Sequence, residues 1–107
     1  MKNPKQRVWS QGDVVLLEEK LPEDAVEVKS HDGVLAHGEV TGHRHRIVKG
    51  EVRFFRSEKG EYLQVLSDRA ILSHEDHPNV SIGRGVTRYY QEREVDWMSE
   101  AVRNVAD

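Results

Sequence analysis

Residues 51–66 read EVRFFRSEKGEYLQVL, and this stretch determines the class of fold that we predict. Its two ends, 51–56 and 61–66, alternate apolar and polar side chains with the period of a half-buried β-strand. The polar loop between them is short and ends in Gly60, a residue that tolerates positive φ. The stretch therefore predicts an antiparallel β-hairpin.

Short strand-like runs of the same kind lie on both sides of this hairpin. They occupy residues 14–17, 26–28, 34–40, 70–72, 80–82 and 86–94. We expect Gly83-Arg84-Gly85 to form a turn before the last of these runs. Since no run before residue 96 has the period of a helix, the pattern predicts an all-β fold. A small antiparallel barrel or a jelly-roll-like sandwich fits it best.

The two ends of the chain have a different character. Residues 1–7 are basic and contain no strand pattern, so we expect a flexible or loosely docked arm. Trp97, Ala101 and Val105 are spaced as i, i+4 and i+8, which is the spacing of one helical face. We therefore predict a short C-terminal helix over residues 96–107, within a single domain that spans residues 1–107.

Composition excludes several classes of protein. The chain has 107 residues and a net charge of −3, so nothing in its charge favours binding to nucleic acid or to an anionic membrane. It contains no cysteine, and any metal ligands must therefore be histidine or carboxylate. There is neither a secretory signal pattern nor an apolar run of about 20 residues that could cross a membrane. We expect a cytoplasmic protein.

A closely spaced histidine pair marks the first half of a candidate site. His43 and His45 stand two residues apart after Thr41-Gly42. In an extended strand, residues i and i+2 point to the same face. Both imidazoles can therefore reach one ion, while Arg44 and Arg46 point the other way.

A second histidine pair lies about thirty residues further along the chain. His74 and His77 enclose two acidic residues, Glu75 and Asp76, and Pro78 follows. Because proline disfavours helical backbone in the residue before it, a turn or a bulge is the better prediction for this segment. The sequence leaves open whether His74 or His77 faces the first pair.

The two pairs together predict a divalent metal site. The predicted ligands are His43, His45, His74 and His77, and a donor set of imidazole and carboxylate suits zinc, iron, nickel or manganese. Three protein ligands with an open position would make the site catalytic, and four would make it structural. Glu75 is the predicted proton carrier, and Asp76 is the second candidate for a catalytic carboxylate.

The motifs of the cupin superfamily, small jelly-roll barrels, resemble part of this chain. The first cupin motif has a Gly, a His-x-His pair and a Glu, the order in which Gly38, His43, His45 and Glu51 stand here. Residues 82–85 resemble the turn of the second motif, but Arg88 stands near the position of its histidine. The resemblance implies a cupin-like metal site only if His74 or His77 takes the place of that histidine.

A second resemblance covers most of the chain. It is to a widespread group of small bacterial and phage-type proteins without an assigned activity. The segments that carry it are QGDV at 11–14, GEVTGHRH at 38–45, HEDH at 74–77 and the strand-like run at 88–94. This resemblance implies a shared fold and no particular activity.

Three functions remain open at this point. The first is metal-assisted hydrolysis, or a related acid–base step, on an unknown small molecule. The second is a metal-free hydrolase in which a histidine and a carboxylate form an acid–base pair. The third is a non-enzymatic β module that binds a protein partner or forms a homo-oligomer through its histidine clusters.

Overall fold

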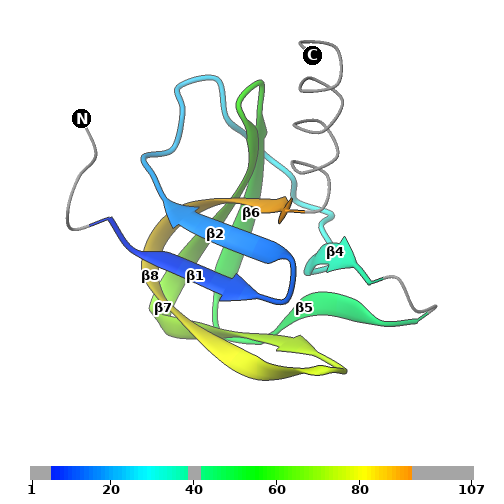
Figure 1. Ribbon diagram of the computed structural model, residues 1–107. Helices are drawn as coiled ribbons and strands as arrows, with labels where there is room; N and C mark the ends of the chain where they lie inside the picture. Colours follow the sequence, from blue (N-terminus) through cyan, green and yellow to red (C-terminus); the bar gives the residue numbers. More distant parts are fainter. Residues whose placement is uncertain (1–5, 39–41, 93–107) are drawn as a thin grey trace, which may run out of the picture.

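The structure is a computed structural model, and it describes residues 6–38 and 42–92 of the chain. Within these residues it consists of strands joined by turns (Figure 1). The strands are β1 Val8–Gln11, β2 Val14–Glu18, β3 Val26–Glu27, β4 Val34–His37, β5 Arg44–Lys49, β6 Val52–Ser57, β7 Gly60–His74 and β8 His77–Gln91. The prediction of an all-β fold is confirmed.

All the strands belong to one antiparallel sheet that curls into a half-barrel (Figure 1). The main path runs in the order β1-β2-β8-β7-β5-β4, while β6 pairs with β7 and β3 pairs with β6. Strand β7 has two partners on the same edge, because its first half pairs with β6 and its second half with β5. The register of β7 against β8 shifts between Val65 and Arg69, where the strand pair bends.

The predicted hairpin at 51–66 is present as β6 and the first half of β7. Phe54 lies opposite Leu63, and Ser57 lies opposite Gly60. Gly60 has a φ of +138°, a backbone conformation that favours glycine. The prediction made from the loop is therefore confirmed.

The prediction of a turn at Gly83-Arg84-Gly85 is wrong. These residues lie inside β8, which continues without interruption from His77 to Gln91. Gly83 packs so closely under Arg7 that a Cβ there would lie 2.5 Å from Arg7 Nη1. The glycines allow close approach and bending of a long strand, which sequence patterns do not distinguish from a turn.

The core is a single cluster of buried side chains. It is formed by the buried side chains Val14, Leu16, Phe54, Leu63, Val65, Ala70, Leu72, Ile82 and Tyr89. Their alternation with exposed residues along each strand explains the strand pattern of the sequence. Fully burying a side chain of this kind stabilises the fold by about 1.5–3 kcal/mol.

The two predicted terminal segments are described only in part. Gln6 donates to the carbonyl of Glu18 at 2.8 Å, and Arg7 Nη2 lies 2.5 Å from Glu18 Oε2, so the end of the predicted arm is docked on β2. Residues 1–5 and the predicted helix over 96–107 lie outside the described residues. Among the described residues there is no helix that could cross a membrane.

Candidate functional site

Two hairpin turns lie at the end of the half-barrel where the candidate residues gather. The β1–β2 hairpin turns through Gly12 and Asp13, because Gln11 pairs with Val14. Gly12 has a φ of +57° and takes the first central position, which a type II′ turn reserves for glycine. This turn places the Asp13 side chain at the edge of the site.

The second turn carries the acidic pair. His74 pairs with His77, so the β7–β8 hairpin turns through Glu75 and Asp76. This arrangement confirms the prediction of a turn before Pro78. It also brings both histidines of the segment to adjacent positions at the start and the end of one tight turn.

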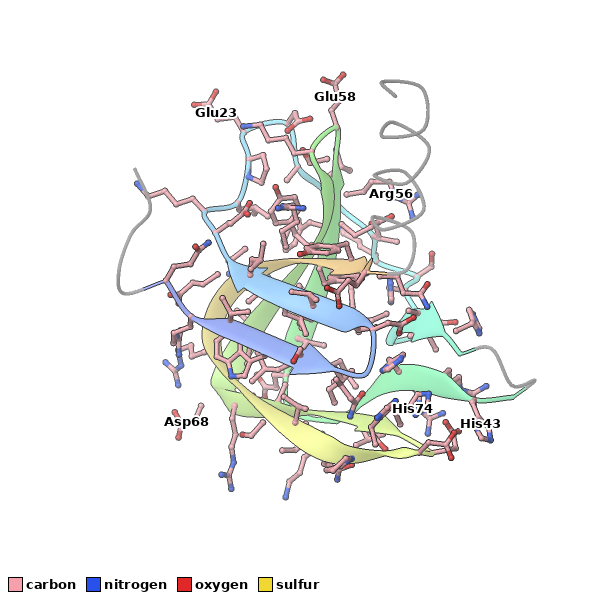
Figure 2. All side chains as sticks on the ribbon, in the orientation of Figure 1. Glu23, His43, Arg56, Glu58, Asp68 and His74 are labelled. Atoms are coloured by element: carbon pink, nitrogen blue, oxygen red, sulfur yellow. The ribbon has the colours of Figure 1, made fainter. Side chains whose placement is uncertain are left out.

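Strand β5 brings the first histidine pair to the second, with His45 inside the strand and His43 just before its first residue, Arg44. Arg46 lies opposite Ser73, so the residues that precede Arg46 run beside the β7–β8 turn. The backbone N–H of Arg44 donates to Glu75 Oε1 at 3.0 Å. His43 and His74 consequently lie side by side at this end of the molecule (Figure 2).

Five of the six predicted site residues line a single open pocket of about 440 Å³. Its lining residues are Gly12, Asp13, Gly38, His43, His45, His74, Asp76 and His77. Glu75 does not line this pocket. It lines a smaller pocket with Arg44, Arg46, Val48 and Ser73.

The four imidazole rings form one contiguous cluster with His74 at its centre. The ring centroid of His74 lies 4.2 Å from that of His45, 4.8 Å from His77 and 5.9 Å from His43. The other two histidines lie elsewhere. His31 stacks on Phe54 with 3.6 Å between ring centroids, and His37 is exposed at the end of β4.

His45 is the buried member of the cluster, with an exposed fraction of 1%. Its Nδ1 lies 2.9 Å from Oε1 of Gln11, which is itself 3% exposed. The Gln11 amide N–H groups donate to the carbonyls of Leu72 and Pro78 at 3.0 and 2.9 Å. Since Oε1 can only accept, His45 Nδ1 must carry the proton in this bond. The other nitrogen of His45, Nε2, faces the pocket.

Burial also changes the acidity of His45. Desolvation, followed by repulsion from His74, lowers the pKa of His45 from its ordinary value to about 4. A neutral imidazole with Nδ1 protonated has an unprotonated Nε2. His45 is therefore a lone-pair donor at neutral pH.

Asp76 organises the exposed side of the pocket. Its Oδ2 lies 2.8 Å from His43 Nδ1, and its backbone N–H donates to His74 Nδ1 at 3.0 Å. A carboxylate on Nδ1 leaves Nε2 of His43 available to a ligand. His74 Nδ1 is the acceptor of this second bond, so His74 would bind an ion only by exchanging the contact with the Asp76 backbone for the ion.

Glu75 stays close to two of the histidines, although it lines another pocket. One ligand atom from each of His43, His74 and Glu75 can be chosen so that all three lie within 4.8 Å of one another. The backbone N–H of Arg44 lowers the pKa of Glu75 below its ordinary value. Glu75 is therefore a proton acceptor at neutral pH rather than a proton donor.

Two glycines make room for the rings. A Cβ on Gly12 would lie 2.6 Å from His77 Nε2, and a Cβ on Gly38 would lie 3.2 Å from His74 Nε2. A side chain at position 12 would therefore collide with the His77 ring unless that ring moved. The backbone at Gly12 therefore forms part of the wall on which His77 rests.

Sequence reasoning missed Gln11, Asp13 and Gln91. Asp13 Oδ1 lies 3.5 Å from His45 Nε2, and Gln91 Nε2 lies 3.2 Å from Asp13 Oδ2. The only sequence signal is that Gln11 and Asp13 flank Gly12 in a turn. Nothing in the local pattern shows which histidine that turn faces, because the two segments meet only through the sheet.

Fold and site together define an all-β half-barrel with a histidine-lined pocket at one end. The chain belongs to the family described as "Domain of unknown function (DUF8820)", whose model matches residues 10–92. No curated protein matches the chain, and neither does any solved structure. The predicted membership in an uncharacterised group is thus confirmed, whereas a bacterial or phage origin stays a prediction.

Proposed function

We propose that the pocket binds a divalent transition-metal ion through the cluster of His43, His45, His74 and His77. The supporting observation is the convergence of four imidazoles and the carboxylate of Asp76 in one open pocket. The nearby group of His43, His74 and Glu75 adds ligand atoms within 4.8 Å of one another. Zinc, iron, nickel and manganese all accept such donors.

The clustering favours a metal over a purely structural role. Imidazoles whose ring centroids lie 4.2 to 5.9 Å apart cannot all hold a positive charge without strong repulsion. As neutral rings they add little to the core, because His77 is exposed and His43 and His74 are half-buried. Several neutral imidazoles that lie close together can all coordinate one metal cation.

We further propose that the site supports metal-assisted hydrolysis or a related acid–base step. The pocket is open, and an ion held by three of its protein ligands would keep a further position for water or substrate. Such an ion would act as a Lewis acid and lower the pKa of bound water. Asp76 would hold His43 in one orientation, and the ionised Glu75 would accept a proton.

One alternative rests on a specific contact. His43 Nδ1 and Asp76 Oδ2 lie 2.8 Å apart, which is the geometry of a histidine–carboxylate acid–base pair. A metal-free hydrolase could use this pair directly. Chelation separates the two functions, since only the metal-dependent activity would be lost. For either function, we propose that the protein acts in the cytoplasm.

The proposed metal binding is tested with protein purified without an affinity tag and stripped by a chelator. Calorimetric titration with Zn²⁺ should show one ion bound per chain. The variants His43→Ala and His77→Ala should bind at least about 10-fold more weakly. His37→Ala is the matched control, because His37 is an exposed histidine outside the pocket, and its affinity should equal that of the wild type. A folded wild-type protein that binds no metal would rule the proposal out.

A further inference from the structure

The geometry points to a further ligand in the pocket: we infer that Asp13 coordinates the ion together with His45. We also infer that Gln91 and Gln11 are positioning residues that hold this pair from behind. The inference rests on the proposed metal function, and it adds three residues that the histidine pattern does not contain.

The distance between Asp13 and His45 is the first argument. Asp13 Oδ1 and His45 Nε2 lie 3.5 Å apart. A direct hydrogen bond between such groups would measure about 2.7–2.9 Å. Two ligands at about 2.1 Å from one ion, in tetrahedral geometry, lie roughly 3.4 Å apart. The observed spacing matches that of two ligands on one ion, and a bound ion would replace the long contact through which Asp13 raises the pKa of His45.

The direction of the lone pairs is the second argument. The Gln11 amide is fixed by two backbone carbonyls, so it presents an acceptor to His45 Nδ1. Nδ1 donates its proton in that bond, so Nε2 is the nitrogen that can bind the ion. A buried imidazole that is held in one tautomer and aimed at a carboxylate is a preorganised ligand.

The support behind Asp13 is the third argument. Gln91 Nε2 donates to Asp13 Oδ2 at 3.2 Å and to the carbonyl of His37 at 3.1 Å. This contact leaves Oδ1 as the oxygen that faces His45. The turn through Gly12 holds the Asp13 backbone, so both ligand atoms are fixed without any contribution from the exposed histidines.

The ligand role of Asp13 is tested by titrating chelator-stripped protein with Co²⁺ and recording the visible absorption of the bound ion. Asp13→Asn should bind Co²⁺ about 10–100-fold more weakly and shift the absorption bands. Asp68→Asn is the matched control, since Asp68 is exposed and lies far from His43 and His74 (Figure 2). Its affinity and spectrum should equal those of the wild type.

The role of Gln11 is tested on metal-free protein by long-range ¹H–¹⁵N NMR of the histidine rings. In the wild type, His45 should be protonated at Nδ1, and in Gln11→Met that preference should be lost. A spectrum of the intact fold, recorded in parallel, separates this change from unfolding. Wild-type His45 protonated at Nε2 alone would overturn the role of Gln11.

The outcomes separate this inference from the proposed function. If the wild type binds Co²⁺, and His43→Ala weakens binding but Asp13→Asn does not, the metal function stands and the ligand pair is overturned. If the wild type binds neither Co²⁺ nor Zn²⁺, both fall. Weakened binding with shifted bands in Asp13→Asn, and an unchanged Asp68→Asn, would support the pair.

Discussion

The imidazole of His77 rests on the backbone of Gly12, so closely that a Cβ at Gly12 would lie 2.6 Å from Nε2. The two residues are 65 positions apart in the chain (77 − 12) and meet because the β1–β2 and β7–β8 turns reach the same end of the sheet. The contact makes a glycine in one hairpin a determinant of ring position in another.

Gly12→Ala should therefore affect the site as well as stability. Alanine at a φ of +57° should lower the free energy of unfolding by about 1 kcal/mol. Because His77 is exposed, its ring can swing away from the new methyl group, and Zn²⁺ affinity should fall with it. Urea denaturation and calorimetry measure the two effects.

Gly42→Ala is the matched control for that variant. Gly42 also has positive φ, +87°, but a Cβ there would meet nothing within 4 Å. It should lose a similar amount of stability and keep the wild-type affinity for Zn²⁺. Equal affinities in Gly12→Ala and Gly42→Ala would show that the contact with His77 does not matter for binding.

Gly50→Ala should destabilise the protein more than Gly60→Ala. Both glycines have positive φ, +108° and +138°, so both variants should lose about 1 kcal/mol from the backbone. At Gly50 a Cβ would also lie 2.7 Å from the carbonyl oxygen of Arg69 and 2.8 Å from the Cα of Ala70. Backbone atoms cannot move aside easily, which should add roughly 1–3 kcal/mol. Thermal unfolding that ranks the two variants in the reverse order would contradict this account.

Thr87→Val should stabilise the protein. The Thr87 side chain is buried, with an exposed fraction of 2%, and its hydroxyl has no hydrogen-bond partner among the described residues. Valine has nearly the same shape and removes the desolvated hydroxyl, so the free energy of unfolding should rise by about 1 kcal/mol. Thr87→Ser keeps the hydroxyl and loses a methyl group, and it should be less stable than the wild type. Chemical denaturation of the three proteins gives the ranking.

The metal-free protein should lose stability as the pH falls below the ordinary range of histidine. The pKa of His45 is about 4 in the folded protein, against about 6.5 in an unfolded chain. The unfolded chain therefore binds the proton first. The contribution of His45 is complete above pH 6.5 and is lost between about pH 6.5 and 4, for a total of roughly 3 kcal/mol.

Denaturation in the presence of a chelator, at several pH values, measures this dependence. NMR titration of the folded protein provides the check on its origin. The ring signals of His45 should not move until the pH approaches 4, whereas a free histidine titrates near about 6.5. A His45 signal that titrates near the free value in the folded protein would contradict the assignment.

The strand pattern and the hairpin were predictable because they depend on local chemistry. Alternating apolar residues bury one face of a strand wherever it lies, and Gly60 permits the turn whatever surrounds it. The presence of a glycine in the sequence did not show whether it forms a turn or makes room for a neighbouring side chain. The glycines at 83 and 85 lie within a continuous strand, where they provide space for Arg7 rather than a turn.

The amino-acid sequence by itself determined the all-β class, the hairpin at 51–66 and the turn between His74 and His77, since each depends on neighbours a few residues apart. It did not determine where β5 begins, because that strand starts at Arg44 and His43 lies before it. Only the tertiary structure decided that the two histidine pairs face one pocket, and that Gln11 and Asp13 join them. The register of β5 against β7 and the curl of the sheet bring these segments together. Register and curl arise from pairing between distant strands, so no local pattern encodes the distance between His45 and Asp13.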